Sequence, residues 1–133
     1  MKRLVLSMLL LLLFATPALA KHKHPEKWYQ EQWCAQHGGV VEYVLPDKTR
    51  VDCLTTTHAW EFDFASKWYE GVTQALHYGR LTGKRPGLVL ILEQPKDHLR
   101  VYPAQAVIRY YNLPLDLETI VNSGPGDKAL SKE

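Results

Sequence analysis

Residues 86–93, with the sequence PGLVLILE, form a continuous apolar run bounded by turn-forming residues. A strand of this composition has no polar face to turn toward water, so other elements must cover both of its faces. A sheet with helices on both sides meets that requirement. The run therefore predicts an α/β fold in which residues 86–93 lie inside the sheet.

The residues before this run predict a helix followed by three strands. Aromatic residues recur at helical spacing behind a proline, which suits the start of a helix, until two glycines interrupt the pattern. Two runs of β-branched and aromatic residues then flank a turn-like segment, and a third run alternates aromatic with acidic residues. These elements are a helix from Pro25 to Gly38, a hairpin of residues 40–45 and 50–54, and a strand of residues 59–64.

The rest of the chain predicts two further helices and a last strand. Ser66 is placed to cap one helix, Pro103 is placed to open another, and alternation resumes over residues 113–121. The order helix, three strands, helix, strand, helix, strand describes a mixed central sheet flanked by helices. We expect a single domain over residues 21–121 and a disordered polar tail over residues 122–133.

The N-terminus predicts export. A basic start, an unbroken apolar run and the closing sequence ALA form the three-part pattern of a secretory signal peptide over residues 1–20. The run is too short for a comfortable membrane span, and no later segment is apolar enough for one, so we expect a periplasmic or secreted protein with no membrane span after cleavage. The sequence KHKH at residues 21–24 is predicted to be flexible and solvated.

Charge gives little support for general nucleic-acid binding. Loss of the leader removes two of the 16 Lys and Arg residues and none of the 14 Asp and Glu residues, which leaves equal numbers of the two. A domain that binds nucleic acid without sequence preference usually carries a basic excess.

Cys34 and Cys53 are the two cysteines of the chain. An even number of cysteines in an exported protein favours a disulfide over free thiols. A metal site is the alternative, and it would need histidine or carboxylate partners from elsewhere. Because Cys53 and Asp52 face opposite sides of their strand, a bridge would hold the first helix on the sheet face away from Asp52.

Three carboxylates fall on two neighbouring strands of the predicted sheet. Glu61 and Asp63 are two residues apart and project from one face, and Asp52 lies in the middle of the preceding strand. Clustered carboxylates repel one another unless a cation offsets them, and hard divalent cations are held by such oxygen ligands. We expect Asp52, Glu61 and Asp63 to bind Mg²⁺ or Mn²⁺. Ca²⁺ bound for structure alone is one alternative, and ordinary pairing of Glu61 with Arg50 or Lys67 is another.

Lys67, Gln74 and Tyr78 lie on one face of the helix that follows. Lys67 is four residues beyond Asp63, so its ammonium can swing toward the carboxylates, and the other two can present an amide and a hydroxyl to the same cleft. Each residue alone is more simply interpreted as a solvated or core-margin side chain. Their joint order and spacing favour a catalytic site.

With this arrangement the sequence resembles the PD-(D/E)XK nuclease superfamily, in particular the branch related to the RecB nuclease domain. The family has a helix, three antiparallel strands, a helix and a strand, with Asp on the second strand, an acidic-X-Lys triplet on the third and Q-x-x-x-Y on the next helix. The matching segments RVDCL, WEFDF and QALHY supply Asp52, Glu61, Gln74 and Tyr78, and Glu42 or Glu31 are candidates for an additional acid.

The resemblance spans roughly residues 25–93. It implies a restriction-endonuclease-like αβββαβ core and a Mg²⁺-dependent phosphodiesterase, with nucleic acid as the substrate.

One residue departs from the family pattern. Asp63 occupies the place of the triplet lysine, which in the family helps to position and activate the attacking water, and an acid cannot do that. The resemblance then implies that Lys67 supplies the missing cation. The opposite interpretation is equally open: a catalytically inactive exported module of the same fold that binds an unknown partner through Trp28, Trp33 or Trp60.

Overall fold

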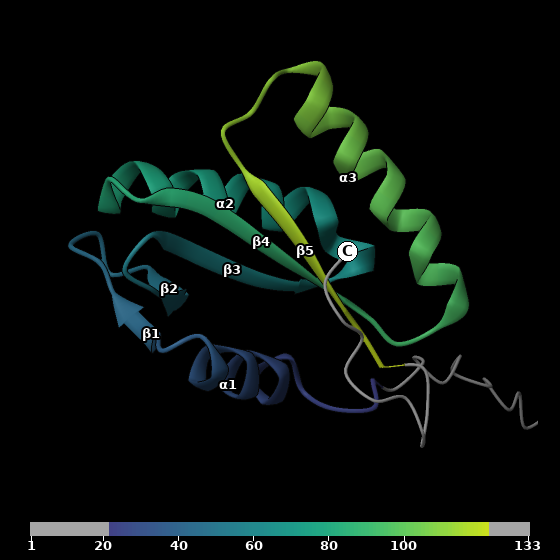
Figure 1. Ribbon diagram of the computed structural model, residues 1–133, viewed down its shortest axis with the longest axis horizontal. Coiled ribbons are helices and arrows are strands. Elements are labelled where there is room, and N and C mark those ends of the chain that lie inside the picture. The colour runs from purple at the N-terminus through teal and green to yellow at the C-terminus, as the bar shows by residue number, and fades with distance from the viewer. Residues whose placement is uncertain (1–21, 123–133) are drawn as a thin grey trace, which may run out of the picture.

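A computed structural model describes residues 22–122 of the chain, so the predicted leader and the predicted tail beyond Asn122 lie outside the described residues. A five-stranded sheet runs through the molecule with helices on both faces (Figure 1). The elements are α1 (Glu26–Gln36), β1 (Val40–Val44), β2 (Arg50–Leu54), β3 (His58–Phe64), the 3₁₀ turn η1 (Ala65–Lys67), α2 (Trp68–Thr82), β4 (Arg85–Leu92), the 3₁₀ turn η2 (Pro95–Asp97), α3 (His98–Tyr110) and β5 (Asp116–Val121).

The strands stand in the sheet in chain order, β1-β2-β3-β4-β5. The first three pair antiparallel, whereas β4 runs parallel to β3 and β5 runs parallel to β4. Parallel neighbours need a crossover connection, which α2 provides between β3 and β4 and α3 provides between β4 and β5. The chain therefore has the expected α/β class, with a mixed sheet flanked by helices.

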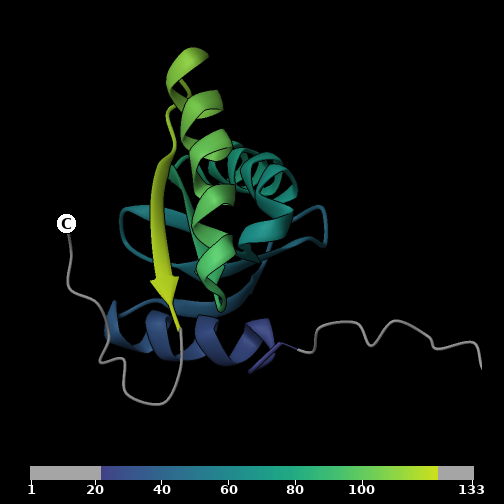
Figure 2. The ribbon, with the colours of Figure 1, turned by 90° about the vertical axis from the view of Figure 1, so that its right-hand side faces the viewer.

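α1 covers one face of the sheet, and α2 and α3 cover the other (Figures 1 and 2). β4 lies between these layers, and its residues from Leu88 to Leu92 are at most 1% exposed. Its three leucines pack in the cluster that contains residues of α2 and α3, while Val89 and Ile91 pack toward α1. The prediction that residues 86–93 form a strand buried on both faces is confirmed.

A disulfide between Cys34 and Cys53 joins α1 to β2, with the two Cα atoms 5.7 Å apart. Both cysteines are fully buried, and they pack with Trp33, Trp60 and Phe62 between α1 and the sheet. The predicted disulfide is confirmed. Disulfides are typical of proteins that fold in oxidising compartments, which is consistent with an exported protein.

Two of the three tryptophans expected at a partner surface belong to this core. Trp33 is 9% exposed and Trp60 is 5% exposed, and their rings meet edge to face. Trp28 is 41% exposed, so it is the one of the three that lies on the surface.

The predicted starts of the second and third helices need correction. α2 begins at Trp68 after a 3₁₀ turn, and Ser66 lies inside that turn without capping the helix. α3 begins at His98, so Pro103 lies within the helix. Its start is set upstream, where Gln94 and Asp97 form a reciprocal capping box around η2.

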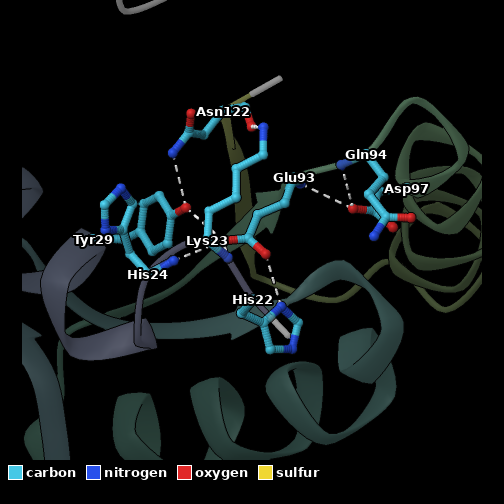
Figure 3. Close-up of polar contacts among 8 residues, drawn as sticks. All are labelled: His22, Lys23, His24, Tyr29, Glu93, Gln94, Asp97 and Asn122. Atoms are coloured by element: carbon cyan, nitrogen blue, oxygen red, sulfur yellow. Dashed lines mark hydrogen bonds and ion pairs between the residues drawn. The ribbon is translucent and has the colours of Figure 1, made fainter. Parts of the chain in front are cut away.

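The segment His22–His24 is held against the sheet by Glu93, the residue that follows β4 (Figure 3). Glu93 Oε2 lies 2.8 Å from Nδ1 of His22, and Oε1 accepts hydrogen bonds from the backbone N–H groups of Lys23 at 3.0 Å and His24 at 3.4 Å. His22 and Lys23 are exposed, as expected for a solvated stretch, and the hydrogen bonds to Glu93, which is 6% exposed, are an addition that the sequence did not predict.

The same network reaches α1 and the end of β5. Tyr29 Oη donates to Glu93 Oε1 at 2.6 Å and accepts from Nδ2 of Asn122 at 2.9 Å. Burial alone would raise the pKa of Glu93, but the hydrogen bonds from Tyr29 and His22 bring that pKa below its ordinary value. The network thus ties the two ends of the described chain to the C-terminal end of β4.

None of the helices within residues 22–122 is both long enough and apolar enough to cross a membrane.

Candidate active site

β2 and β3 bring two carboxyl groups together. Their antiparallel register pairs Leu54 with Ala59 and Cys53 with Trp60, and Asp52 and Glu61 are the next residues along the two strands. Asp52 Oδ2 accepts a hydrogen bond from the backbone N–H of Phe62 at 2.8 Å. This contact fixes the Asp52 carboxylate beside Glu61, as expected for carboxylates on neighbouring strands.

The two carboxyl groups line an open cavity of about 390 Å³. Residues from α1, the β1–β2 hairpin, β3 and α2 contribute to its walls. The lining residues are Glu26, Glu42, Lys48, Thr49, Arg50, Asp52, Glu61, Gln74 and Tyr78. Acidic residues outnumber basic ones in this set, which suits the cavity to a cation.

A distortion of β1 supports one side of the cavity. Glu42 has a positive φ of 54°, unusual for a residue in a strand. The buried amide of Gln30 on α1 donates to Glu42 Oε1 at 3.2 Å and to the backbone carbonyl of Asp52 at 2.6 Å. Arg50 Nε lies 3.2 Å from the other oxygen of Glu42. Gln30 thus connects α1 to both strands directly behind the acidic cluster.

The carboxyl groups of Asp52 and Glu61 titrate as a pair. Burial raises the pKa of both groups, and the charge of Asp52 together with a hydrogen bond between the two carboxyl groups raises the pKa of Glu61 further. The pair therefore retains a proton near neutral pH. Glu61 is 5% exposed, and within residues 22–122 its buried Oε2 atom has no hydrogen-bond partner.

Glu26 and Asp63 extend the acidic cluster. Burial and the charge of Asp52 raise the pKa of Glu26 to about 7. Burial and the charge of Glu26 raise the pKa of Asp63 to about 7 as well. The positive charge of Lys67 acts in the opposite direction and lowers the pKa of both Glu26 and Asp63. Its ammonium group therefore lies near these two acids.

Gln74 and Tyr78 line the cavity from α2. Gln74 is exposed, whereas Tyr78 is 8% exposed and packs against Leu45, Val51 and Ala59. Burial, followed by the charges of Glu61 and Asp52, raises the pKa of Tyr78 above its ordinary value. The phenol therefore stays protonated and can act as a hydrogen-bond donor.

The structure gathers most of the residues expected at the site. Asp52, Glu61, Gln74 and Tyr78 line one cavity, and Glu42, one of the two candidates for an additional acid, lines it too. The remaining residues lie elsewhere: Asp63 is buried beside the cluster but outside the cavity lining, Lys67 is exposed beside Asp63, and Glu31 pairs with Lys27 at 3.6 Å.

The sequence does not predict the remaining four cavity residues, which are Glu26, Lys48, Thr49 and Arg50. An acid in the first turn of a helix is normally interpreted as a partner of the helix dipole, which is how Glu26 would be read. Lys48 and Arg50 come from the hairpin, and no sequence pattern relates a hairpin turn to a helix that begins 20 residues later. No signal short of the three-dimensional arrangement identifies them.

Within residues 22–122, no three His, Cys, Asp or Glu side chains come close enough together to hold one metal ion. The same residues do contain the neighbouring carboxyl groups of Asp52 and Glu61, and the Oε2 atom of Glu61 has no hydrogen-bond partner among them.

A second cavity, of about 430 Å³, lies beside Glu93. Its lining includes Lys96 and Arg100, but its two carboxylates already accept hydrogen bonds, Glu93 from the N-terminal segment and Asp97 from the backbone of residues 93 and 94. It therefore lacks the unpaired buried acceptor that distinguishes the first cavity.

No protein-family model matches this chain, and no curated protein or solved structure matches it either.

Proposed function

We propose that this protein is an exported, divalent-cation-dependent phosphodiesterase with a restriction-endonuclease-like core, and that it cleaves nucleic acid. The observation that carries the proposal is the Glu61 Oε2 atom, a buried acceptor without a partner in residues 22–122, beside Asp52 in an acidic cavity.

The donor set fits a hard cation. A buried carboxylate oxygen without a donor costs on the order of 1–3 kcal/mol, and a second carboxylate at hydrogen-bonding distance adds repulsion once both ionise. A divalent cation held by Asp52 and Glu61 removes both penalties. Mg²⁺ commonly binds through one or two carboxylates and keeps several waters, so two protein ligands are sufficient for Mg²⁺ or Mn²⁺.

The surrounding side chains suit phosphoryl chemistry. A bound cation supplies Lewis-acid polarisation of a phosphoryl oxygen. The protonated hydroxyl of Tyr78 and the amide of Gln74 are donors that orient the phosphate group. Lys67, beside Asp63 and Glu26, is the group proposed to assist the attacking water, since Asp63 cannot do so.

The placement of these residues along the fold supports the proposed family. The order α1, β1, β2, β3, α2, β4 has an Asp on β2, a Glu on β3, and Gln and Tyr on the next helix. These four side chains line a single cavity, which is the relationship that the resemblance implies. The disulfide supports export to the periplasm or beyond.

A second candidate function is a non-catalytic exported module of the same fold. Asp63 in place of the triplet lysine favours it. In that case the partner surface includes Trp28, which stacks on His24 and remains partly exposed.

Isothermal titration of Mg²⁺ and Mn²⁺ into the wild-type protein and into an Asp52→Asn/Glu61→Gln variant tests the proposal, together with a plasmid-nicking assay on the same samples. Asn at position 52 keeps an oxygen that can accept the hydrogen bond from the backbone N–H of Phe62, so the variant can preserve this contact between β2 and β3. A Glu31→Gln variant is the matched control, since Glu31 pairs with Lys27 on α1 and does not line the cavity.

Cation binding and nicking that disappear together in the double variant, but persist in Glu31→Gln, support the nuclease. Cation binding without nicking, accompanied by a rise in thermal stability with Ca²⁺, would favour a structural ion. If the wild-type protein neither binds the cations nor nicks the plasmid, the non-catalytic binding module becomes the favoured function.

A further inference from the structure

The turn between β1 and β2 is rigidly built. Leu45 N–H donates to the carbonyl of Thr49 at 2.8 Å, and Lys48 N–H donates to the carbonyl of Leu45 at 2.9 Å. Asp47 Oδ1 accepts from the backbone N–H of Thr49 at 3.0 Å and from its hydroxyl at 2.6 Å. Lys48 takes the left-handed conformation that this turn needs, with φ at 73°.

The turn is also fastened to α2. Nε2 of His77 lies 2.7 Å from Oδ2 of Asp47, and the side chain of Leu45 is buried with Tyr78. The tip of the hairpin is therefore fixed against the helix that carries Gln74 and Tyr78. Because it is fixed there, Lys48 is one of the residues that line the acidic cavity.

Lys48 differs from the other cations near the site. Arg50 is engaged by Glu42 at 3.2 Å. Lys67 lies beside Asp63 and Glu26, outside the cavity lining. No hydrogen bond or ion pair within residues 22–122 occupies the ammonium of Lys48, and its side chain is exposed.

We propose that Lys48 is the anion-binding residue of this cavity and contacts an oxygen of a phosphate ester whose phosphate also meets the cation on Asp52 and Glu61. This inference rests on the proposed function. Carboxylates repel a phosphate, so positive charge beside the cation strengthens its binding, and a lysine is a compact, mobile charge suited to that contact. The geometry thus assigns substrate binding to Lys48 and leaves Lys67 to the acids at the end of β3.

Titration of thymidine 5′-monophosphate into the Mg²⁺-loaded protein tests the role of Lys48, with thymidine as the ligand that lacks the phosphate. The test variant is Lys48→Asn, because asparagine tolerates the left-handed backbone and removes the charge. Lys48→Arg restores the charge. Lys67→Ala and Lys96→Ala remove a lysine beside the acids and a lysine in the second cavity.

We expect Lys48→Asn to weaken binding of the nucleotide by about tenfold, with Mg²⁺ binding unchanged or tighter, since loss of a nearby positive charge favours the cation. Lys48→Arg recovers the nucleotide affinity, the control Lys96→Ala keeps it, Lys67→Ala loses less of it than Lys48→Asn does, and thymidine binds none of the proteins measurably. A role limited to neutralising the carboxylates would change Mg²⁺ affinity without changing nucleotide affinity.

The inference is overturned if Lys48→Asn binds the nucleotide as the wild-type protein does, or if Lys67→Ala shows the larger loss. Either result with normal Mg²⁺ binding leaves the proposed function standing. Failure of the wild-type protein to bind Mg²⁺ would overturn both proposals together.

Discussion

Asp52 of β2 and Glu61 of β3 lie within hydrogen-bonding reach of each other, and burial raises the pKa of both carboxyl groups. Glu26 and Asp63 nearby have pKa values of about 7 for related reasons. Folding therefore favours the protonated form of these four carboxyl groups. That preference has measurable consequences for stability and for ligand binding.

The stability of the cation-free protein should fall as the pH rises from 5 to 8. A carboxyl whose pKa is higher in the folded state than in the unfolded chain stabilises the fold while it is protonated, and this contribution is lost as the pH rises through the folded pKa, here about 7 for Glu26 and Asp63. We expect the free energy of unfolding, measured in urea, to drop by at least about 1 kcal/mol across this range.

Glu61→Gln should flatten that pH dependence, because the amide carries no charge at any pH. The ion pairs of His22, His58 and His77 with Glu93, Asp116 and Asp47 are unchanged in this variant. Asp47 and Asp116, whose pKa values are lowered to about 2 by their hydrogen bonds, lose their contribution only below pH 4 and so do not affect the window. A stability that rises toward pH 8 would contradict the assignment.

Cation binding should release a proton. The carboxyl pair of Asp52 and Glu61 retains a proton near neutral pH, and a metal ion must displace it. We expect Mg²⁺ affinity to increase by up to about tenfold per pH unit between pH 6 and 8. Calorimetry in two buffers of different ionisation enthalpy measures the proton directly, and equal heats in both buffers would exclude proton release.

Gly87→Ala should destabilise the fold by about 1–3 kcal/mol. A Cβ at this position of β4 would lie 2.2 to 2.6 Å from the indole ring of Trp60, which is packed against Trp33 and Phe62 and has no room to withdraw. The midpoint of urea unfolding measures the loss. In a double variant with Trp60→Leu the two costs should be less than additive, whereas additive costs would mean that the contact is absent.

Glu93→Ala should lower stability by about 1–3 kcal/mol and leave Mg²⁺ binding unchanged. Alanine removes both carboxylate oxygens, including the Oε1 atom that accepts hydrogen bonds from Tyr29, Lys23 and His24. Released from Glu93, the backbone at Lys23 should be cleaved faster by trypsin. Tyr29→Phe is the partner variant, and its cost should overlap with that of Glu93→Ala because both changes break one network (Figure 3).

Much of the fold follows from local patterns. The apolar run of β4 and the alternation of β3 carry information about strand formation within a few residues, and both strands are confirmed. The even number of cysteines favours a disulfide, which is confirmed too. The start of α3 could not be predicted in the same way. Pro103 is a strong signal for a first turn, but the capping box at Gln94 and Asp97 begins the helix earlier and overrides it.

The site was predictable to the extent that it depends on strand alternation and helix spacing. Asp52, Glu61, Gln74 and Tyr78 meet because two neighbouring strands and one helix face the same side. Glu26 and Lys48 join them through the packing of α1 and the fastening of the hairpin to α2, which depend on contacts such as Gln30 to Asp52 and His77 to Asp47. Contacts of this kind join residues far apart in sequence, and they have no local pattern.

The order of the strands has a consequence for synthesis of the chain. Because each strand of the sheet β1-β2-β3-β4-β5 pairs with its neighbour in sequence, the sheet can grow by vectorial addition, one strand at a time, onto an edge that already exists. Until β5 arrives, β4, which is apolar from Pro86 to Leu92, is that edge, and the backbone groups on its free side are unpaired. A ribosomal product that stops before Asp116 therefore exposes an adhesive edge, and such premature chains should self-associate into insoluble material.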